Sequence, residues 1–458
     1  MLKRLGVASL VAISMSGIAG AEHPSQSTRL PATERGPIPA FTTLRVVHAQ
    51  AIEPPEPLPP GTSPEVDRRG LTLTDLEQMA LANNPSIARA EALVSAARGN
   101  WVQVGLPPNP TTGYEGQQIG SAGKAEQDGA FIGQEIVRGG KLRLNREIAA
   151  QEINRAEQQL AAQRQRVLTD VRIAYNAVLI ANRQEQLTAE LMQVAKEGMS
   201  AAETLFKGKE VGRADMLQAE IEYENTTVLI ENARNRSAAA WQSLGNIIGQ
   251  SRLEPQRLAG VPDEDRGVLQ FEALKEHLLT ASPEVAVAVA NVERSRWALQ
   301  RARVEPIPNV TVQGLVNWRD NGIGGASDGA ITVGIPLPAW NRNQGGIAQA
   351  QAEVAAAERA LQQVELNLQN RLAPVYERYA NSRNQVAKYR SRIIPAASET
   401  LELTRRTYAA GEASYVSLLT AQRTYSQTNL NYLDALRELR SSEAELEGML
   451  LRGSLEDR

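Results

Sequence analysis

The residue types that most often carry enzyme chemistry are sparse in this chain of 458 residues. It has no cysteine, and its three histidines, His23, His48 and His277, lie far apart in the sequence. Thiolate and imidazole metal centres need such residues in clusters, and nucleophilic catalysis needs a base beside its nucleophile. We therefore expect no catalytic residue, no metal site and no cofactor, and we do not expect an enzyme.

One basic motif is the nearest approach to a phosphate-binding loop. It consists of Gly139-Gly140-Lys141, followed by Arg143 and Arg146. The surrounding pattern of a P-loop is missing, so the motif favours the basic start of a long helix. The whole chain has 49 Lys and Arg against 52 Asp and Glu, which gives no basic surface for nucleic acid.

The N-terminus has the pattern of an export signal. Lys3 and Arg4 precede an apolar stretch that ends in small residues at Ala21. We therefore predict a signal peptide over residues 1–21. Residues 22–69 contain ten of the 23 prolines, which predicts an extended linker. Beyond the signal no apolar run reaches about 18 residues, so no membrane-spanning helix is expected.

Past residue 70 the chain repeats itself after about 200 residues. Leu81–Pro85 matches Leu279–Pro283, and Pro108-Asn109 matches Pro308-Asn309. Such a long period indicates a structural unit that is used twice. The predicted halves are residues 70–260 and 261–452, with residues 453–458 as a tail.

Each half is predicted to contain a long helical hairpin, over about 141–250 and 346–450. Small or apolar residues recur every seven positions from Ile153 to Ala202, which is the pattern of a coiled-coil seam. A helix over 141–206 would be about 100 Å long. Pro374 and Pro395 should kink or interrupt its counterpart. Glycines in the two hairpin turns are expected to supply left-handed backbone.

A β-hairpin is predicted before each helical hairpin, over about 111–137 and 309–337. Residues 309–319 and 330–337 alternate between an apolar and a mixed face. Strands of about 9–11 residues with this alternation suit a transmembrane β-barrel, and a small soluble sheet fits them equally well. In lipid, four strands cannot close a barrel, so three chains would have to share 12 strands. Trp318 and Trp340 could then lie in aromatic belts at the membrane surfaces.

The order of these features resembles the TolC family of outer-membrane efflux proteins. The motifs that carry the resemblance are Leu81–Pro85, Gly105–Pro110, Gly139–Lys141 and Ala214–Ala219. Pro336–Pro338 and Asn341–Gly346 resemble the cation-efflux (CzcC-like) branch. The implied fold is mainly α with a small β part. Duplicated coiled-coil hairpins would form a periplasmic tunnel, and four strands per chain would join a trimeric 12-stranded barrel.

The resemblance also implies a function and partners. A homotrimer in outer-membrane lipid, extending into the periplasm, would dock a periplasmic adaptor linked to an inner-membrane pump of the RND type. It would passively conduct cargo, and the cation-efflux motif favours heavy-metal or divalent cations. Drugs or proteins of type I secretion are alternative cargoes. A periplasmic coiled-coil adaptor is a further alternative, although the duplicated β-hairpin argues against it.

In this family the tunnel narrows at the helical-hairpin turns, where acidic residues commonly form a ring. The matching positions here are Ser417 and Thr420, so that acidic ring is missing. The remaining carboxylates at the turns are Glu210, Asp215 and Glu412. A threefold ring of carboxylates would attract cations, and solvated helix-end charge is an equally good interpretation. The candidate adaptor contacts are the turn residues Gly208, Gly212, Gly411 and Ser414.

Overall fold

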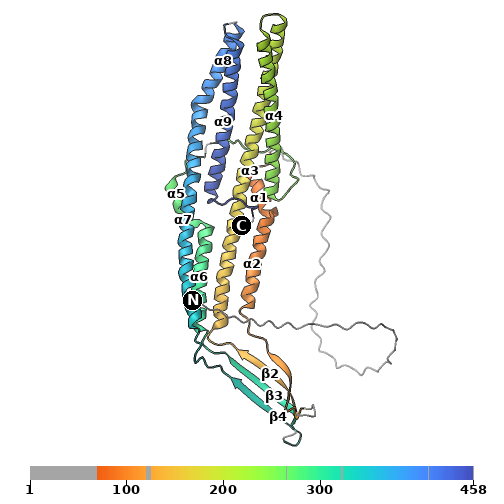
Figure 1. Ribbon diagram of the computed structural model, residues 1–458, viewed down its shortest axis with the longest axis vertical. Helices are drawn as coiled ribbons and strands as arrows, with labels where there is room; N and C mark the ends of the chain where they lie inside the picture. The colour runs from red at the N-terminus through yellow and green to blue at the C-terminus, as the bar shows by residue number, and fades with distance from the viewer. Residues whose placement is uncertain (1–69, 120–124, 265, 321–322, 411, 457–458) are drawn as a thin grey trace, which may run out of the picture. The chain divides into compact units, whose positions relative to one another are not determined.

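The computed structural model describes residues 70–119, 125–264, 266–320, 323–410 and 412–456. The predicted signal peptide and proline-rich linker lie outside these ranges, as does the adaptor-contact candidate Gly411. The described residues form long helices and a four-stranded sheet (Figure 1). Within these ranges, no helix combines the length and the apolar character needed to cross a membrane.

The sheet is antiparallel and has the strand order β1-β2-β3-β4. Its strands are β1 (Thr111–Gln117), β2 (Gln127–Ile136), β3 (Val310–Asp320) and β4 (Ala326–Gly334). The central pair, β2 and β3, comes from different halves of the chain, so the sheet joins the two halves. Strand β4 ends earlier than the alternation predicts, because Pro336 has no N–H with which to continue the ladder.

The helices of the first half are α1 (Leu73–Asn83), α2 (Pro85–Gln103), α3 (Lys141–Lys207) and α4 (Arg213–Ile248). Asn84 separates α1 from α2, and its Oδ1 accepts the N–H of Ser86 at 2.9 Å. The Asn84 amide nitrogen also donates to the carbonyl of Ile247 at 2.6 Å. The side chain that ends one helix therefore holds α2 against the end of α4.

The second half repeats this layout. Its helices are α5 (Phe271–Ala281), α6 (Pro283–Val304), α7 (Gln344–Lys388), α8 (Ile394–Ala409) and α9 (Tyr415–Glu447). A short π-helix, η2 (Tyr389–Ile393), joins α7 to α8. Pro374 lies inside α7 without ending it, whereas η2 ends at Ile393, two residues before Pro395. The two prolines that were expected to disturb the second long helix therefore act differently.

Two apolar clusters form the core, one in each half. The first packs α1, α3 and α4 together through Leu76, Val167, Val171, Trp241 and Leu244. The second packs α7 and α9 through Leu368, Leu372, Tyr379, Leu436 and Leu439. Helix α3 also adds Ile180 and Leu187 to the second cluster. Because α3 belongs to both clusters, it fixes the base of one helical hairpin against the other.

Candidate functional site

The left-handed residue in the turn between α3 and α4 is a lysine rather than a glycine. Lys209 has φ +65°, whereas the φ angles of Gly208 and Gly212 are −73° and −79°. The N–H of Glu210 donates to the carbonyl of Leu205 at 2.9 Å, which closes a Schellman motif around Lys209. The expectation that these two glycines supply left-handed backbone was wrong. Helix α3 continues to Lys207, one residue too far for Gly208 to be the left-handed residue, which is Lys209 instead.

Replacing Lys209 with glycine should stabilise this turn by about 1 kcal/mol, because glycine adopts left-handed backbone without a Cβ clash. Hydrogen exchange of the amides in residues 203–213 would measure the change, expected as roughly fivefold slower exchange. The matched control is Ala201→Gly in the exposed last turns of α3, which should have the opposite sign and a similar size. Equal effects of both variants would contradict the strain at Lys209.

The turn between α8 and α9 is closed by side-chain hydroxyls. The Ser414 hydroxyl accepts the N–H of Ser417 at 3.2 Å and lies 3.0 Å from the Ser417 hydroxyl, so both residues serve the cap of α9. The hydroxyl of Thr420 donates to the carbonyl of Val416 at 2.8 Å. Ser414, Ser417 and Thr420 are all exposed, and each of their hydroxyl groups already makes a hydrogen bond within α9 or its cap.

The three candidate carboxylates have different surroundings. Glu210 and Glu412 are exposed at the two turns. Asp215 is half-buried, and its Oδ2 accepts the N–H of Gly212 at 3.2 Å, which caps α4. Burial, followed by the negative charge of Asp215, raises the pKa of Tyr408 in the second hairpin. The structure thus brings Asp215 toward the other hairpin, while Glu210 and Glu412 point to solvent.

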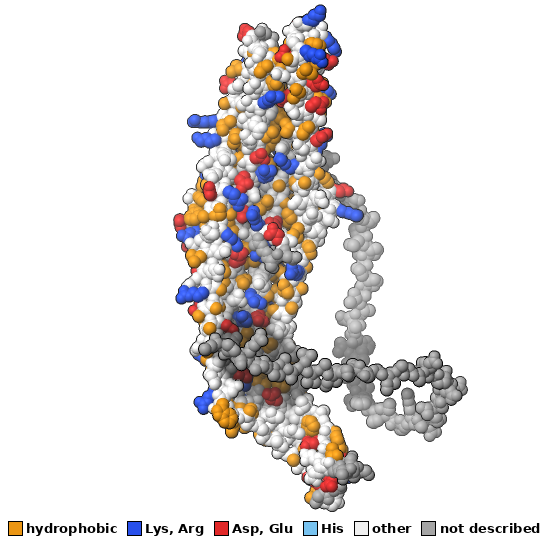
Figure 2. All heavy atoms as spheres, viewed as in Figure 1, with side chains coloured by type: hydrophobic (Ala, Val, Ile, Leu, Met, Phe, Trp, Pro, Cys, Tyr) orange, Lys and Arg blue, Asp and Glu red, His pale blue; other side chains and the backbone are white. Residues whose placement is uncertain are grey.

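Basic side chains also gather at the first turn. Lys207, Lys209 and Arg213 lie within seven residues of each other, and Lys207 forms an ion pair with Glu203 at 3.1 Å. Figure 2 shows Lys and Arg side chains at the end of this hairpin. A ring built from several copies of this turn would therefore carry both signs of charge rather than an acidic rim alone.

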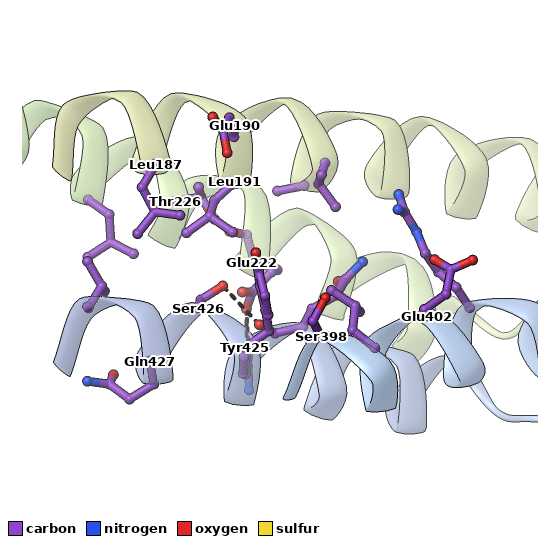
Figure 3. A pocket seen from close by; sticks show the side chains of 18 residues that line it. Leu187, Glu190, Leu191, Glu222, Thr226, Ser398, Glu402, Tyr425, Ser426 and Gln427 are labelled. Carbon is purple, nitrogen blue, oxygen red and sulfur yellow. Dashed lines mark hydrogen bonds and ion pairs between the residues drawn. The ribbon is translucent and has the colours of Figure 1, made fainter. Parts of the chain in front are cut away.

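A cleft of about 580 Å³ lies between the two helical hairpins. Leu187 and Leu191 point into it from α3, and Glu222 and Thr226 border it from α4 (Figure 3). Figure 3 also labels Glu190 of α3 and five lining residues of α8 and α9: Ser398, Glu402, Tyr425, Ser426 and Gln427. The cleft thus combines apolar side chains of α3 with charged side chains, Glu190, Glu222 and Glu402, from both hairpins.

Sequence reasoning missed two further contacts, one that joins the two hairpins and one within the second hairpin. Arg423 of α9 pairs with Glu222 of α4 at 2.7 Å. The ring of Tyr415 packs edge-on against Tyr408 at 6.1 Å, and burial, followed by the charge of Glu222, raises the Tyr415 pKa. The seven-residue spacing from Asp215 to Glu222 does place both acids on one face of α4. Their partners on α8 and α9 could be found only from the tertiary structure.

A duplicated long helical hairpin that begins at a small antiparallel sheet is the architecture of outer-membrane channel subunits. The chain belongs to the outer membrane efflux protein family, whose sequence profile matches residues 76–250 and 274–450. It is therefore an outer-membrane protein of efflux systems, and the predicted resemblance to this family is confirmed. The predicted mainly helical fold class with its small β part is confirmed as well.

Three comparisons illustrate these similarities. The cobalt-zinc-cadmium resistance protein CzcC of Cupriavidus metallidurans is 24% identical over 373 residues, covering 80% of this chain and 86% of that protein. The proteases secretion protein PrtF of Dickeya chrysanthemi is also 24% identical, over 58% of this chain and 60% of that protein. The CmeC outer membrane channel of Campylobacter jejuni superposes with a TM-score of 0.68 at 16% identity, over 84% and 87% of the two chains.

Proposed function

We propose that three copies of this chain form the exit duct of a tripartite efflux complex. The duct would dock a periplasmic adaptor and, through it, an inner-membrane pump of the RND type. It would conduct heavy-metal or divalent cations passively to the exterior. The observation that carries the proposal is the sheet, which has two open edges and an exposed apolar face.

The open edges call for strands from other copies. Strands β1 and β4 are the outer strands of the four-stranded sheet, and every residue of β4 is exposed. Unpaired backbone groups are not tolerated in lipid. If the sheet lies in a membrane, β1 of one copy must therefore pair with β4 of a neighbouring copy. Three copies would then supply 12 strands, which is wide enough for a conduit.

One face of the sheet has the composition of a lipid-facing surface. Ile132, Val316 and Ile331 expose 62%, 63% and 82% of their surface. Trp318 near the end of β3 and Trp340 after β4 are 55% and 91% exposed. Because β3 and β4 are antiparallel, these two indoles lie toward opposite ends of the sheet, as belts at two membrane surfaces would require.

The first helical hairpin carries a second surface suited to self-association. Leu217, Ile221 and Val228 of α4 are 42%, 55% and 55% exposed, at spacings that place them along one side of the helix. A stripe of this kind suits a neighbouring copy packed beside α4. The sheet edges therefore favour contacts between copies in the strand region, and this stripe favours contacts between copies in the helical region.

The cargo is proposed from sequence similarity to the CzcC-like branch. Deleting the gene should increase sensitivity to zinc, cobalt and cadmium, with little change in sensitivity to a panel of drugs. Growth inhibition with and without the plasmid-borne gene would measure this. New drug sensitivity with unchanged metal tolerance would instead favour a drug duct, and loss of an exported protease would favour the secretion role in PrtF's name.

The aperture is proposed to lie at the turns, with Glu210, Asp215, Glu412, Ser417 and Thr420 around it. Replacing Glu412 with Gln should lower the preference for cations over anions, because each copy would lose one exposed charge. Reversal potentials across a salt gradient in planar bilayers would measure that preference. Thr420→Val is the matched control, since it leaves the charge unchanged. An unaltered reversal potential in the Glu412 variant would place this carboxylate away from the conduction path.

The adaptor is proposed to contact the same turns through Gly208, Gly212, Gly411 and Ser414. Small side chains there would let another helical tip approach the backbone closely. The outer-membrane location of the family and the secretion and resistance systems named for the relatives support a partner of this kind.

A further inference from the structure

The second long helix contains a weak point that the first does not. The π-helix η2 separates α7 from α8, whereas α3 runs from Lys141 to Lys207 as one α-helix. Pro395 explains the position of η2, because its ring would clash with the carbonyl of Ser391 in regular α-helix and it has no N–H to offer. Short π-helices of this kind often mark places where a helix bends.

Helix α8, which follows η2, makes few buried contacts. Among the described side chains of α8, only Ala397 is buried. Helix α8 packs mainly against α9, whereas α3 packs against helices of both halves. A helix with few buried contacts opens more easily than its neighbours, so α8 is the part of the second hairpin that can move most readily.

A segment between the two halves reaches this weak point. We call residues 258–264 the strap. The strap is fixed to the first half, because Leu258 bridges to Leu71 and the Tyr175 hydroxyl donates to the carbonyl of Ala259. It is fixed to α9 by the buried Arg440, which donates to the carbonyls of Pro262, at 2.8 Å, and Glu264.

Between these anchors, Asp263 contacts the π-helix and α9 at once. Its Oδ1 accepts the hydroxyl of Tyr432 at 2.5 Å and lies 3.7 Å from the Arg390 guanidinium of η2. The Tyr389 ring of η2 packs edge-on against Tyr432 at 6.4 Å. Burial and the hydrogen bond to Asp263 raise the pKa of Tyr432, so its hydroxyl remains a donor at neutral pH.

We propose that the strap is a latch on the η2 hinge, with Asp263 as its positioning residue. While Asp263 holds Tyr432 and Arg390, the base of α8 is fixed to α9 and to the first half. When these contacts break, α8 bends at η2 and the turn end of the second hairpin shifts relative to the first hairpin. This inference rests on the proposed function, since it concerns how the turn end of the duct opens.

Hydrogen exchange of the purified full-length protein tests the latch. Asp263→Ala should accelerate amide exchange about tenfold in residues 394–409, because a hydrogen bond to a charged group is lost at the hinge. Residues 200–215 of the first hairpin should exchange as in the unaltered protein. Tyr432→Phe should give the same pattern more weakly, since it keeps the ring against Tyr389 and loses only the hydroxyl.

The matched control is Asp434→Ala, which removes an acid on α9 whose ion pair with Arg437 stays within that helix. It should leave exchange in residues 394–409 unchanged. Faster exchange confined to the strap in both test variants would overturn the latch, and so would unchanged exchange everywhere. If Asp263→Ala fails to fold, Tyr432→Phe decides alone. None of these readouts depends on cargo, so the metal-sensitivity test can fail or succeed independently.

Discussion

Replacing Ile331 with arginine should prevent stable insertion of the protein into the outer membrane. Ile331 lies near the middle of β4, opposite Gly314, which in turn lies opposite Ile132. This row of the sheet is on the apolar face, where an arginine at the bilayer midplane costs about 2–4 kcal/mol in each copy. Membrane fractionation and the heat-resistant oligomer on denaturing gels would measure the loss.

The adjacent residue provides the control for this prediction. Thr332 lies opposite Gln313, which lies opposite Gly133, so this row is on the other face of the sheet. Thr332→Arg should therefore insert and assemble normally, with at most a change in ion selectivity. If both arginine variants insert equally well, or both fail, the assignment of one face to lipid is wrong.

Replacing Arg440 with methionine should lower the free energy of unfolding by about 3–5 kcal/mol. Arg440 and Glu443 are each 3% exposed, and their side chains meet at 2.6 Å. The substitution leaves the buried Glu443 carboxylate with the more distant Arg266, at 3.8 Å, as its remaining ion-pair partner among the described residues. It also leaves the carbonyls of Pro262 and Glu264 without their donor. Urea denaturation of the detergent-solubilised protein, followed by tryptophan fluorescence, would measure the change.

One turn earlier on α9, Arg437 offers a matched comparison. Its ion pair with Asp434 is about half exposed on both sides, so Arg437→Met should change stability by no more than about 0.5 kcal/mol. A loss below about 1 kcal/mol for Arg440→Met would mean that water replaces the missing guanidinium. The contrast between two arginines on one helix isolates the effect of burial.

Local sequence signals predicted much of the architecture because they act over a few residues. The seven-residue seam from Ile153 to Ala202 marks a long coiled-coil helix. The alternation around Val312 marks a strand. Each of these patterns reports burial or backbone geometry directly, so tertiary contacts did not override it.

The candidate site was less predictable because its contacts join segments far apart in the chain. Left-handed backbone was expected at the glycines of the first turn rather than at Lys209, because the sequence does not show where a helix ends to within one residue. The pair Glu222–Arg423 spans 201 positions. Nothing in the sequence around Asp263 indicates that it meets Tyr432 and Arg390. Such contacts are set by how the two halves pack.

The pairing of β2 with β3 also determines the order in which parts of the chain can fold. About 175 residues separate the two strands, and the first helical hairpin lies between them. During synthesis and export, β2 can pair only with β1 until the second half arrives, and closing so long a loop is slow. The first hairpin can form by local contacts in that interval. The sheet is therefore completed only after the first helical hairpin has had time to fold.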